Sequence, residues 1–165
     1  MKQLKKAMPY FLLLLIWSCA DNKKEEKTNS ASQTEMSKNH VFPKGEKGPS
    51  STFTGTVWHT PLVANDTVYN SIAGQVLFEA GARTHWHSHP AGQILLVLEG
   101  VGYHQIAGEP IEIIKKGDVV KCPPHVNHWH GASKDKTMAH LYWVPNTEKG
   151  IVNWGAAVTD EEYTK

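Results

Sequence analysis

The chain has 165 residues, of which 40% are hydrophobic and 20% are charged, and its formal net charge at pH 7 is +1. This length suits one folded domain with an additional tail. A nearly neutral chain gives no electrostatic reason to expect a nucleic-acid partner or an acidic partner. The two cysteines, Cys19 and Cys122, stand far apart, so no disulfide framework is predicted.

The first 19 residues have the pattern of a signal peptide. Lysines open the segment, and residues 10–17 form an apolar run that is too short to span a bilayer. The run ends at Cys19, as in the precursors of bacterial lipoproteins. We therefore expect a lipid on Cys19 that anchors the protein to the membrane of the cell envelope, on its periplasmic or outer-membrane face. An ordinary secreted protein, cleaved near the same point, is the alternative.

Residues 20–51 are polar and rich in charged side chains, with almost nothing that could be buried in a core. We interpret them as a disordered linker. The folded domain is then expected to comprise residues 52–165.

The domain shows short apolar or alternating runs between Gly- and Pro-rich turns, which indicates an all-β sandwich or barrel. The predicted strands are residues 53–57, 71–78, 94–99, 103–106, 111–115, 118–122, 128–132 and 138–144. Every residue in 94–98 is apolar, so both faces of that strand should be covered, one by the barrel interior and the other by a second sheet or subunit. Residues 159–163 have the spacing of a capping box and predict at most one helical turn.

A histidine-rich stretch precedes a turn at residues 90–92. Side chains two apart in a strand point to the same side, so His87 and His89 aim at one point, and His85 joins them only if the strand is regular there. Gln93 begins the returning strand close to both histidines. Three convergent groups on one hairpin have the geometry of a chelating site, whereas partly exposed strand histidines are the alternative.

A second stretch carries His128 and His130 on one face of another strand. Metal sites usually close with three or four ligands, so one of this pair should complete the set. We predict His128 as the ligand and His130 as a free imidazole beside it. A histidine that only forms hydrogen bonds within the barrel is the alternative for His130. His125, in a Pro-rich loop, is predicted to face solvent.

The two stretches resemble the two sequence motifs of the cupin superfamily. The first match is Gly81-x5-His87-x-His89-x3-Gln93-x6-Gly100, with glutamine in place of the usual glutamate. The second is Gly117-x5-Pro123-x-His125-x2-His128, with His125 in place of a glycine. Residues 53–163 are similar to small single-domain bacterial cupins, a group that includes manganese-dependent hydroxynitrile lyases and proteins associated with carboxymuconolactone decarboxylase. The shared segments are residues 53–57, 78–84, 87–93 and 128–132.

The resemblance implies a single jelly-roll barrel, also described as a double-stranded β-helix. By position it implies that the metal ligands are His87, His89, Gln93 and His128. It implies that Thr84, His130 and His140 line the cavity, and we predict catalytic roles for these three. The sequence departs from these relatives at two positions. His85 stands where they often carry a small residue, and Val144 stands where the lyases carry a polar residue at the end of the pocket, so the resemblance does not identify the substrate.

The metal implied by the resemblance is Mn²⁺, and Fe²⁺, Ni²⁺ and Zn²⁺ are alternatives because imidazole and oxygen ligands suit all of them. Four neutral ligands would leave a divalent ion its full charge, so the ion would be a stronger Lewis acid than with the usual glutamate in place of Gln93. Protonation of the histidines should release the metal below about pH 6.

Three functions fit these residues. The first is a small-molecule enzyme in which the metal polarises the substrate while His130 moves a proton and His140 assists, as in cyanohydrin cleavage or the isomerisation or decarboxylation of small oxo compounds. The second is a metal-dependent dioxygenase. The third is a lipid-anchored cupin that binds a ligand without catalysis.

The parity of the strands places Trp86 and Trp129 on the side away from the metal, towards a second sheet or a subunit contact. This placement favours a homodimer.

Overall fold

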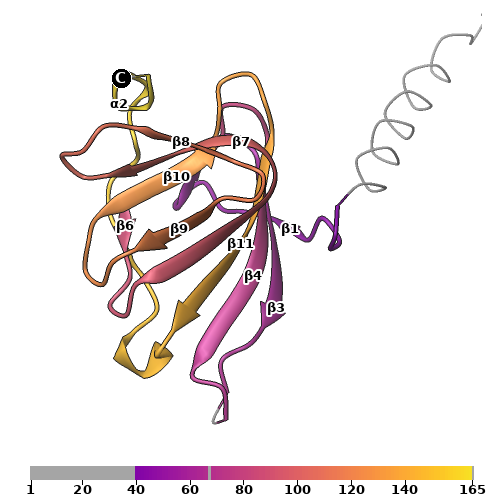
Figure 1. Cartoon of the computed structure of the whole chain (residues 1–165), viewed down its shortest axis with the longest axis vertical. Coiled ribbons are helices and arrows are strands. Elements are labelled where there is room, and N and C mark those ends of the chain that lie inside the picture. The colour runs from indigo at the N-terminus through magenta and orange to yellow at the C-terminus, as the bar shows by residue number, and fades with distance from the viewer. Residues whose placement is uncertain (1–39, 67, 165) are drawn as a thin grey trace, which may run out of the picture. The chain divides into compact units, whose positions relative to one another are not determined.

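Short strands make up nearly all of the regular structure in the computed structural model, which describes residues 40–66 and 68–164 (Figure 1). In chain order the strands are β1 (Glu46–Lys47), β2 (Phe53–Thr54), β3 (Val57–Val63), β4 (Ser71–Phe78), β5 (Arg83–Thr84), β6 (His87–Ser88), β7 (Gln93–Ile106), β8 (Glu112–Lys115), β9 (Val119–Cys122), β10 (His128–Ala132), β11 (Met138–Pro145) and β12 (Asn153–Trp154). The two helical segments are η1 (Thr147–Lys149) and α2 (Asp160–Tyr163), and α2 begins with the predicted capping box. The predicted all-β class is confirmed.

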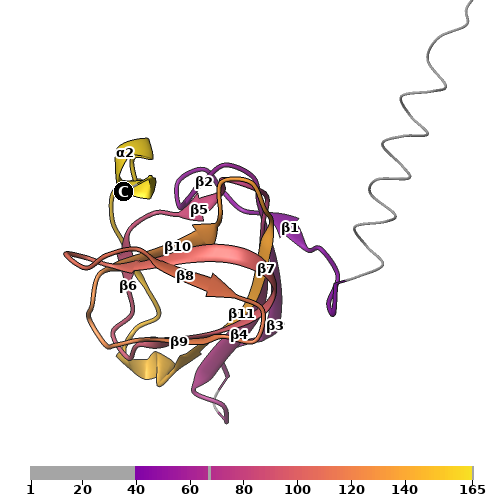
Figure 2. The same ribbon diagram turned by 45° about the horizontal axis from the view of Figure 1, so that its top comes forward.

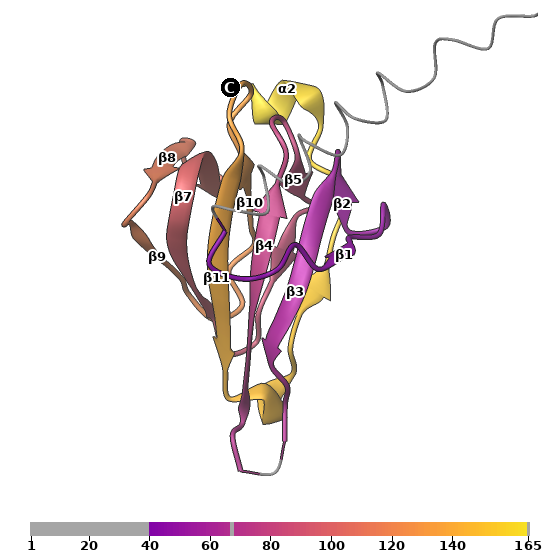
Figure 3. The ribbon, with the colours of Figure 1, turned by 90° about the vertical axis from the view of Figure 1, so that its right-hand side faces the viewer.

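The strands form two antiparallel sheets that share β7. The first sheet has the order β1-β3-β4-β11-β7-β9, and the second has the order β2-β5-β10-β7-β8, with β6 beside β10 and β12 beside β6. Figures 2 and 3 show how the sheets curl around a common interior. This is the jelly-roll barrel expected from the sequence.

The length of β7 differs from our prediction of two strands separated by a turn. Gly100 has φ of +77°, and a Cβ atom there would lie 1.9 Å from the carbonyl oxygen of Thr137. The pairing with β11 also shifts its register at this level, between Ala139 and His140. Glycine therefore bends the strand without ending it, and β7 passes from one sheet to the other.

The barrel interior contains an apolar core, and a second apolar cluster lies outside it. The core includes Val57, Phe78, Leu95 and Met138. The second cluster consists of Trp129, Val158 and Tyr163, with Trp86 packed against it.

The second cluster corrects our interpretation of Trp86 and Trp129. The C-terminal segment of the same chain covers the fully buried Trp129 and packs against Trp86. Arg83 holds that segment, because its Nη2 donates to the carbonyl oxygen of Val158 at 2.9 Å. These two tryptophans therefore give no support for a subunit contact.

Residues 40–51, which we assigned to the linker, pack against the domain in this structure. β1 pairs with β3, the hydroxyl of Thr60 donates to the carbonyl oxygen of Pro43 at 2.7 Å, and Nζ of Lys44 lies 4.0 Å from the ring centroid of Trp58. The rest of the predicted linker and the predicted signal peptide lie outside the described residues. Within residues 40–66 and 68–164, none of the helices is both long and apolar enough to span a membrane.

Candidate metal centre

The first histidine stretch is a hairpin between β6 and β7. The strand is interrupted before it, where the amide of His85 donates to the carbonyl oxygen of Thr52 at 2.9 Å. His85 therefore does not join the alternation, and its side chain does not line the cavity. The turn closes where the amide of Gly92 donates to the carbonyl oxygen of His89 at 3.0 Å. The next residue, Gln93, begins β7 as predicted.

The fold brings the four predicted ligands together. His128 on β10 lies directly opposite His87 on β6 in the register of the sheet. The ring centroids are 4.3 Å apart for His87 and His128, 5.2 Å for His87 and His89, and 5.7 Å for His89 and His128. Oε1 of Gln93 is 3.3 Å from Nε2 of His128. All four side chains are buried.

Backbone carbonyl groups fix the tautomers of the three histidines. Nδ1 of His87, His89 and His128 lies 2.9, 2.6 and 3.0 Å from the carbonyl oxygens of His85, Ile151 and Val126 respectively. A carbonyl oxygen only accepts, so each Nδ1 carries the hydrogen and donates it. In a neutral ring the Nε2 atom is then a bare acceptor, which is the form that binds a metal.

Burial keeps these rings neutral at pH 7. It lowers the pKa of His128 to about 4, that of His87 well below the usual 6.5, and that of His89 in the same direction. The bare Nε2 of His128 therefore faces another acceptor, Oε1 of Gln93, and Nε2 of His89 is buried without a hydrogen-bond partner. Such an arrangement is costly unless a cation lies between the acceptors. Imidazole nitrogens and an amide oxygen are suitable ligands for a divalent metal.

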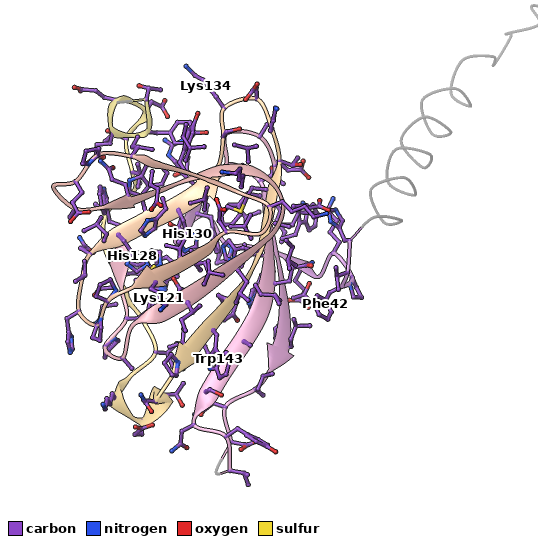
Figure 4. The ribbon with its side chains drawn as sticks, in the orientation of Figure 1. Phe42, Lys121, His128, His130, Lys134 and Trp143 are labelled. Atoms are coloured by element: carbon purple, nitrogen blue, oxygen red, sulfur yellow. The ribbon has the colours of Figure 1, made fainter. Side chains whose placement is uncertain are left out.

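His130 lies beside this centre, close enough to bind an ion there, whereas we predicted only a free imidazole. One nitrogen each of His87, His128 and His130 lie within 4.8 Å of one another, a spacing that could hold a metal ion, and His89 is not part of that group. His130 and His128 both lie inside the curl of the strands (Figure 4). His130 is therefore placed either as a ligand or as a base beside the ligands.

A second histidine holds the ring of His130. Nδ1 of His130 lies 3.2 Å from Nε2 of His140 on β11, and the Nε2 atom of His130 is buried without a partner. The hydroxyl oxygen of Thr84 accepts from the backbone amide of His130 at 3.1 Å. Burial lowers the pKa of His130 well below its usual value and that of His140 to about 4. Both rings are therefore neutral at pH 7.

The site opens into a cavity of about 440 Å³. Among the predicted site residues, Thr84, His87, His89, Gln93, His130 and His140 line it, whereas His128 does not. Most of the remaining wall is apolar and includes Phe53, Val76, Val144 and Trp154. His125 is exposed as predicted, and its φ of +62° suits a position where related motifs carry glycine.

His104 is a buried histidine beside the site that we did not predict from the sequence. Its ring centroid is 5.8 Å from that of His128, and its Nε2 lies 3.6 Å from Sγ of Cys122. The parity of β7 could have indicated it, because His104 lies directly opposite His130 in the register. Burial raises the pKa of Cys122 to about 12, so this thiol is unreactive at neutral pH.

Two aromatic residues of the cavity wall, Trp154 and His59, were also not predicted from the sequence. The ring centroid of Trp154 on β12 lies 4.9 Å from that of His87, and His59 on β3 lines the same cavity. Residues 151–158 showed no strand pattern, so no sequence signal placed Trp154 at the site.

Comparison with known proteins points to one family. Residues 74–145 match the sequence profile of the cupin domain. The chain is 43% identical over 119 residues to an (R)-mandelonitrile lyase from Granulicella tundricola, and this alignment covers 72% of this chain and 91% of that protein. A cupin-like protein from Thermotoga maritima has a similar structure, with 48% identity, a TM-score of 0.74, and coverage of 76% of this chain and 95% of that chain. A DMSP lyase from Ruegeria pomeroyi shares the fold at 18% identity, with a TM-score of 0.54 and coverage of 67% and 60%.

Proposed function

The chain belongs to the cupin family, and from this premise we propose that it is a metal-dependent lyase that cleaves and forms the cyanohydrins of small aldehydes. One observation carries the proposal. A neutral, hydrogen-bonded pair, His130 and His140, lies beside three histidines with bare Nε2 atoms, in a largely apolar cavity. The similarity to a mandelonitrile lyase supports the choice of substrate class.

We propose that His87, His89, Gln93 and His128 bind a divalent ion, with Mn²⁺ as the first choice and Fe²⁺, Ni²⁺ or Zn²⁺ as alternatives. When bound, such an ion acts as a Lewis acid towards a hydroxyl or carbonyl oxygen. The protein contributes four neutral side chains, and the backbone acceptors at His85, Val126 and Ile151 fix the direction of the three rings.

The proton is moved by His130. Its Nε2 atom is bare when Nδ1 carries the ring hydrogen and donates it to Nε2 of His140. Nε2 of His130 then accepts the hydroxyl proton of the cyanohydrin, and the oxygen forms the second bond of the carbonyl group. The bond to the nitrile carbon breaks, and cyanide leaves with the electron pair. His130 returns the proton to cyanide, which gives hydrogen cyanide and the aldehyde.

The residues around His130 position it for this role. Thr84 accepts from its backbone amide, so the hydroxyl hydrogen of Thr84 remains available to a ligand in the cavity. His140 orients the ring, and both rings stay neutral because they are buried. The apolar wall limits the access of water to the negative charge that develops on the substrate during the reaction, which strengthens each hydrogen bond to that charge.

A substitution of His130 tests the proposal. In the metal-loaded protein, His130→Ala should lower the rate of mandelonitrile cleavage by roughly 10²- to 10⁴-fold, the usual contribution of general acid–base catalysis, and leave the bound metal unchanged. His125→Asn, which changes an exposed histidine, is the control and should keep full activity. An active His130→Ala variant would remove this residue from the mechanism, and simultaneous loss of the metal would make it a ligand.

We further propose that the protein is a lipoprotein of the cell envelope, anchored by a lipid on Cys19 after removal of the signal peptide. The polar composition of residues 20–39 suits a tether between that lipid and the domain. Mass spectrometry of the protein purified from its membrane fraction should find a lipid mass on Cys19. The same protein recovered without lipid from the soluble fraction would contradict the proposal.

We retain the homodimer as a proposal, on the outer face of residues 94–98, which the sequence analysis also offered, and no longer on the face of Trp86 and Trp129. Leu96, Val119 and Trp143 lie on the neighbouring strands β7, β9 and β11 and are 37%, 58% and 51% exposed. A second copy could cover this apolar face. Sedimentation equilibrium should show a dimer that Trp143→Lys dissociates, and a monomeric native protein would contradict the proposal.

A further inference from the structure

A second polar pair lines the cavity away from the proposed metal ligands. Nε2 of His59 on β3 lies 2.8 Å from the hydroxyl oxygen of Tyr142 on β11, and the two rings stack with centroids 5.6 Å apart and planes 21° apart. Both residues line the same cavity as His87 and His130. Neither has a part in the proton transfer described above.

The pair exists because β4, the strand between β3 and β11, carries a glycine at this level. Tyr142 lies opposite Gly74 in the register, and Gly74 lies opposite Pro61. A Cβ atom on Gly74 would lie 2.6 Å from the hydroxyl oxygen of Tyr142. The absence of a side chain at Gly74 therefore lets Tyr142 reach across β4 to His59, so the sequence of three strands builds this contact.

The pair lies on the more accessible side of the site. His59 and Tyr142 are half-buried, whereas His87, His130 and His140 are buried. His59 also lies opposite Glu46 of the exposed strand β1. A ligand whose reacting end reaches His130 can therefore extend its other end towards the pair.

The wall of the cavity suits an aromatic ring. Phe53 and Trp154 line it and meet edge to face, with ring centroids 6.0 Å apart. Val76, Val144 and Ile72 also line it. An aryl group would bury its faces against these side chains.

The pair can bind an uncharged hydroxyl or carbonyl group in either tautomer. If Tyr142 donates to Nε2 of His59, its oxygen remains an acceptor; if His59 donates, the phenol hydrogen remains free. Burial lowers the pKa of His59 and raises that of Tyr142, so both are neutral at pH 7. Within the described part of the chain, the only charged residues that line the cavity, Glu46 and Lys47, are of opposite sign, and Glu46 lies opposite His59 in the register. The pair therefore offers hydrogen bonds without a net positive charge, which favours an uncharged group over a carboxylate.

We propose that His59 and Tyr142 form a second polar subsite, which binds an uncharged hydrogen-bonding substituent at the end of the substrate opposite the reacting carbon. The substrate class is then hydroxylated aromatic aldehydes and their cyanohydrins. The inference rests on the proposed function, because that function places the reacting carbon at the histidine cluster.

Binding measurements test the subsite without turnover. Isothermal titration calorimetry of the metal-loaded full chain, without cyanide, compares benzaldehyde with 3- and 4-hydroxybenzaldehyde. The native protein should bind one of the hydroxylated compounds about tenfold more tightly than benzaldehyde, which is the size of one net hydrogen bond. Tyr142→Phe should abolish this preference and leave the affinity for benzaldehyde unchanged.

Two further variants complete the test. His59→Asn should lower the preference as Tyr142→Phe does, and it replaces Tyr142→Phe if that variant does not fold. Tyr103→Phe changes a tyrosine that does not line this cavity and should keep the native preference. A preference that survives in Tyr142→Phe or His59→Asn, or a native protein without preference, overturns the subsite. Native protein that shows the preference but does not cleave cyanohydrins overturns the proposed reaction and leaves the subsite intact.

Discussion

The buried histidines should make the metal-free protein lose stability steeply in mild acid. Burial lowers the pKa of His128 and of His140 from 6.5 to about 4. Between these two values the unfolded chain binds a proton at each residue and the folded chain does not. The free energy of unfolding therefore falls as the pH falls, by roughly 1.4 kcal/mol per pH unit for each histidine, or on the order of 3 kcal/mol each over the whole window. This loss is absent above pH 7.

The substitution His140→Gln isolates one of these contributions. Urea unfolding, with a chelator present, gives the free energy of unfolding at pH 7, 6 and 5. Between pH 7 and 5 the variant should lose about 2 kcal/mol less than the native protein, most of it below pH 6, whatever its stability at pH 7. The control His125→Asn changes an exposed histidine and should keep the native slope. Equal slopes for His140→Gln and the native protein would refute the reasoning.

Three further substitutions test other parts of the structure. Gly100→Ala should destabilise the domain by about 1–3 kcal/mol more than Gly108→Ala. Both positions have positive φ, but only at Gly100 would the added methyl group clash, with the backbone of Thr137. Equal shifts of the melting temperature would contradict this. Arg83→Met should leave the carbonyl oxygen of Val158 without its buried donor, at a cost of about 1–3 kcal/mol, and speed proteolysis of the C-terminal segment; an unchanged cleavage rate would argue against that anchor. Gln93→Glu should tighten metal binding in chelator competition by placing a negative charge among the histidines, and unchanged affinity would exclude Gln93 from the site.

The sequence predicted the strands and the site hairpin well because both follow local rules. Alternation and Gly- or Pro-rich turns locate most strands within a few residues. The turn before Gln93 follows from residues 90–92, and His87 and His89 lie close together as the parity of the strand predicted. The usual number of metal ligands and the family resemblance, and not parity, led us to add His128, whose ring also lies beside theirs.

The sequence could not predict the features that depend on contacts between distant segments. Gly100 looked like a turn, and only its approach to Thr137 shows that it bends a continuous strand. The apolar side of Trp129 looked like a subunit contact because nothing local shows that residues 156–163 return to cover it. The position of His130 within 4.8 Å of two predicted ligands likewise depends on side-chain geometry across the sheet.

The expected pH of metal release also changes with the structure. An ordinary histidine pKa predicts release below about pH 6. Burial lowers the pKa of His128 to about 4, so protons compete with the metal only at lower pH. We now expect release only as the pH falls to about 4 or below.

Metal analysis coupled to an activity assay tests the central claim most directly. The purified protein should bind about one divalent ion per chain. A chelator should remove both the ion and the cleavage of mandelonitrile, and Mn²⁺ should restore both. Protein that binds no divalent ion, or that cleaves mandelonitrile equally well after complete removal of the metal, would contradict the claim that these histidines form a catalytic metal centre.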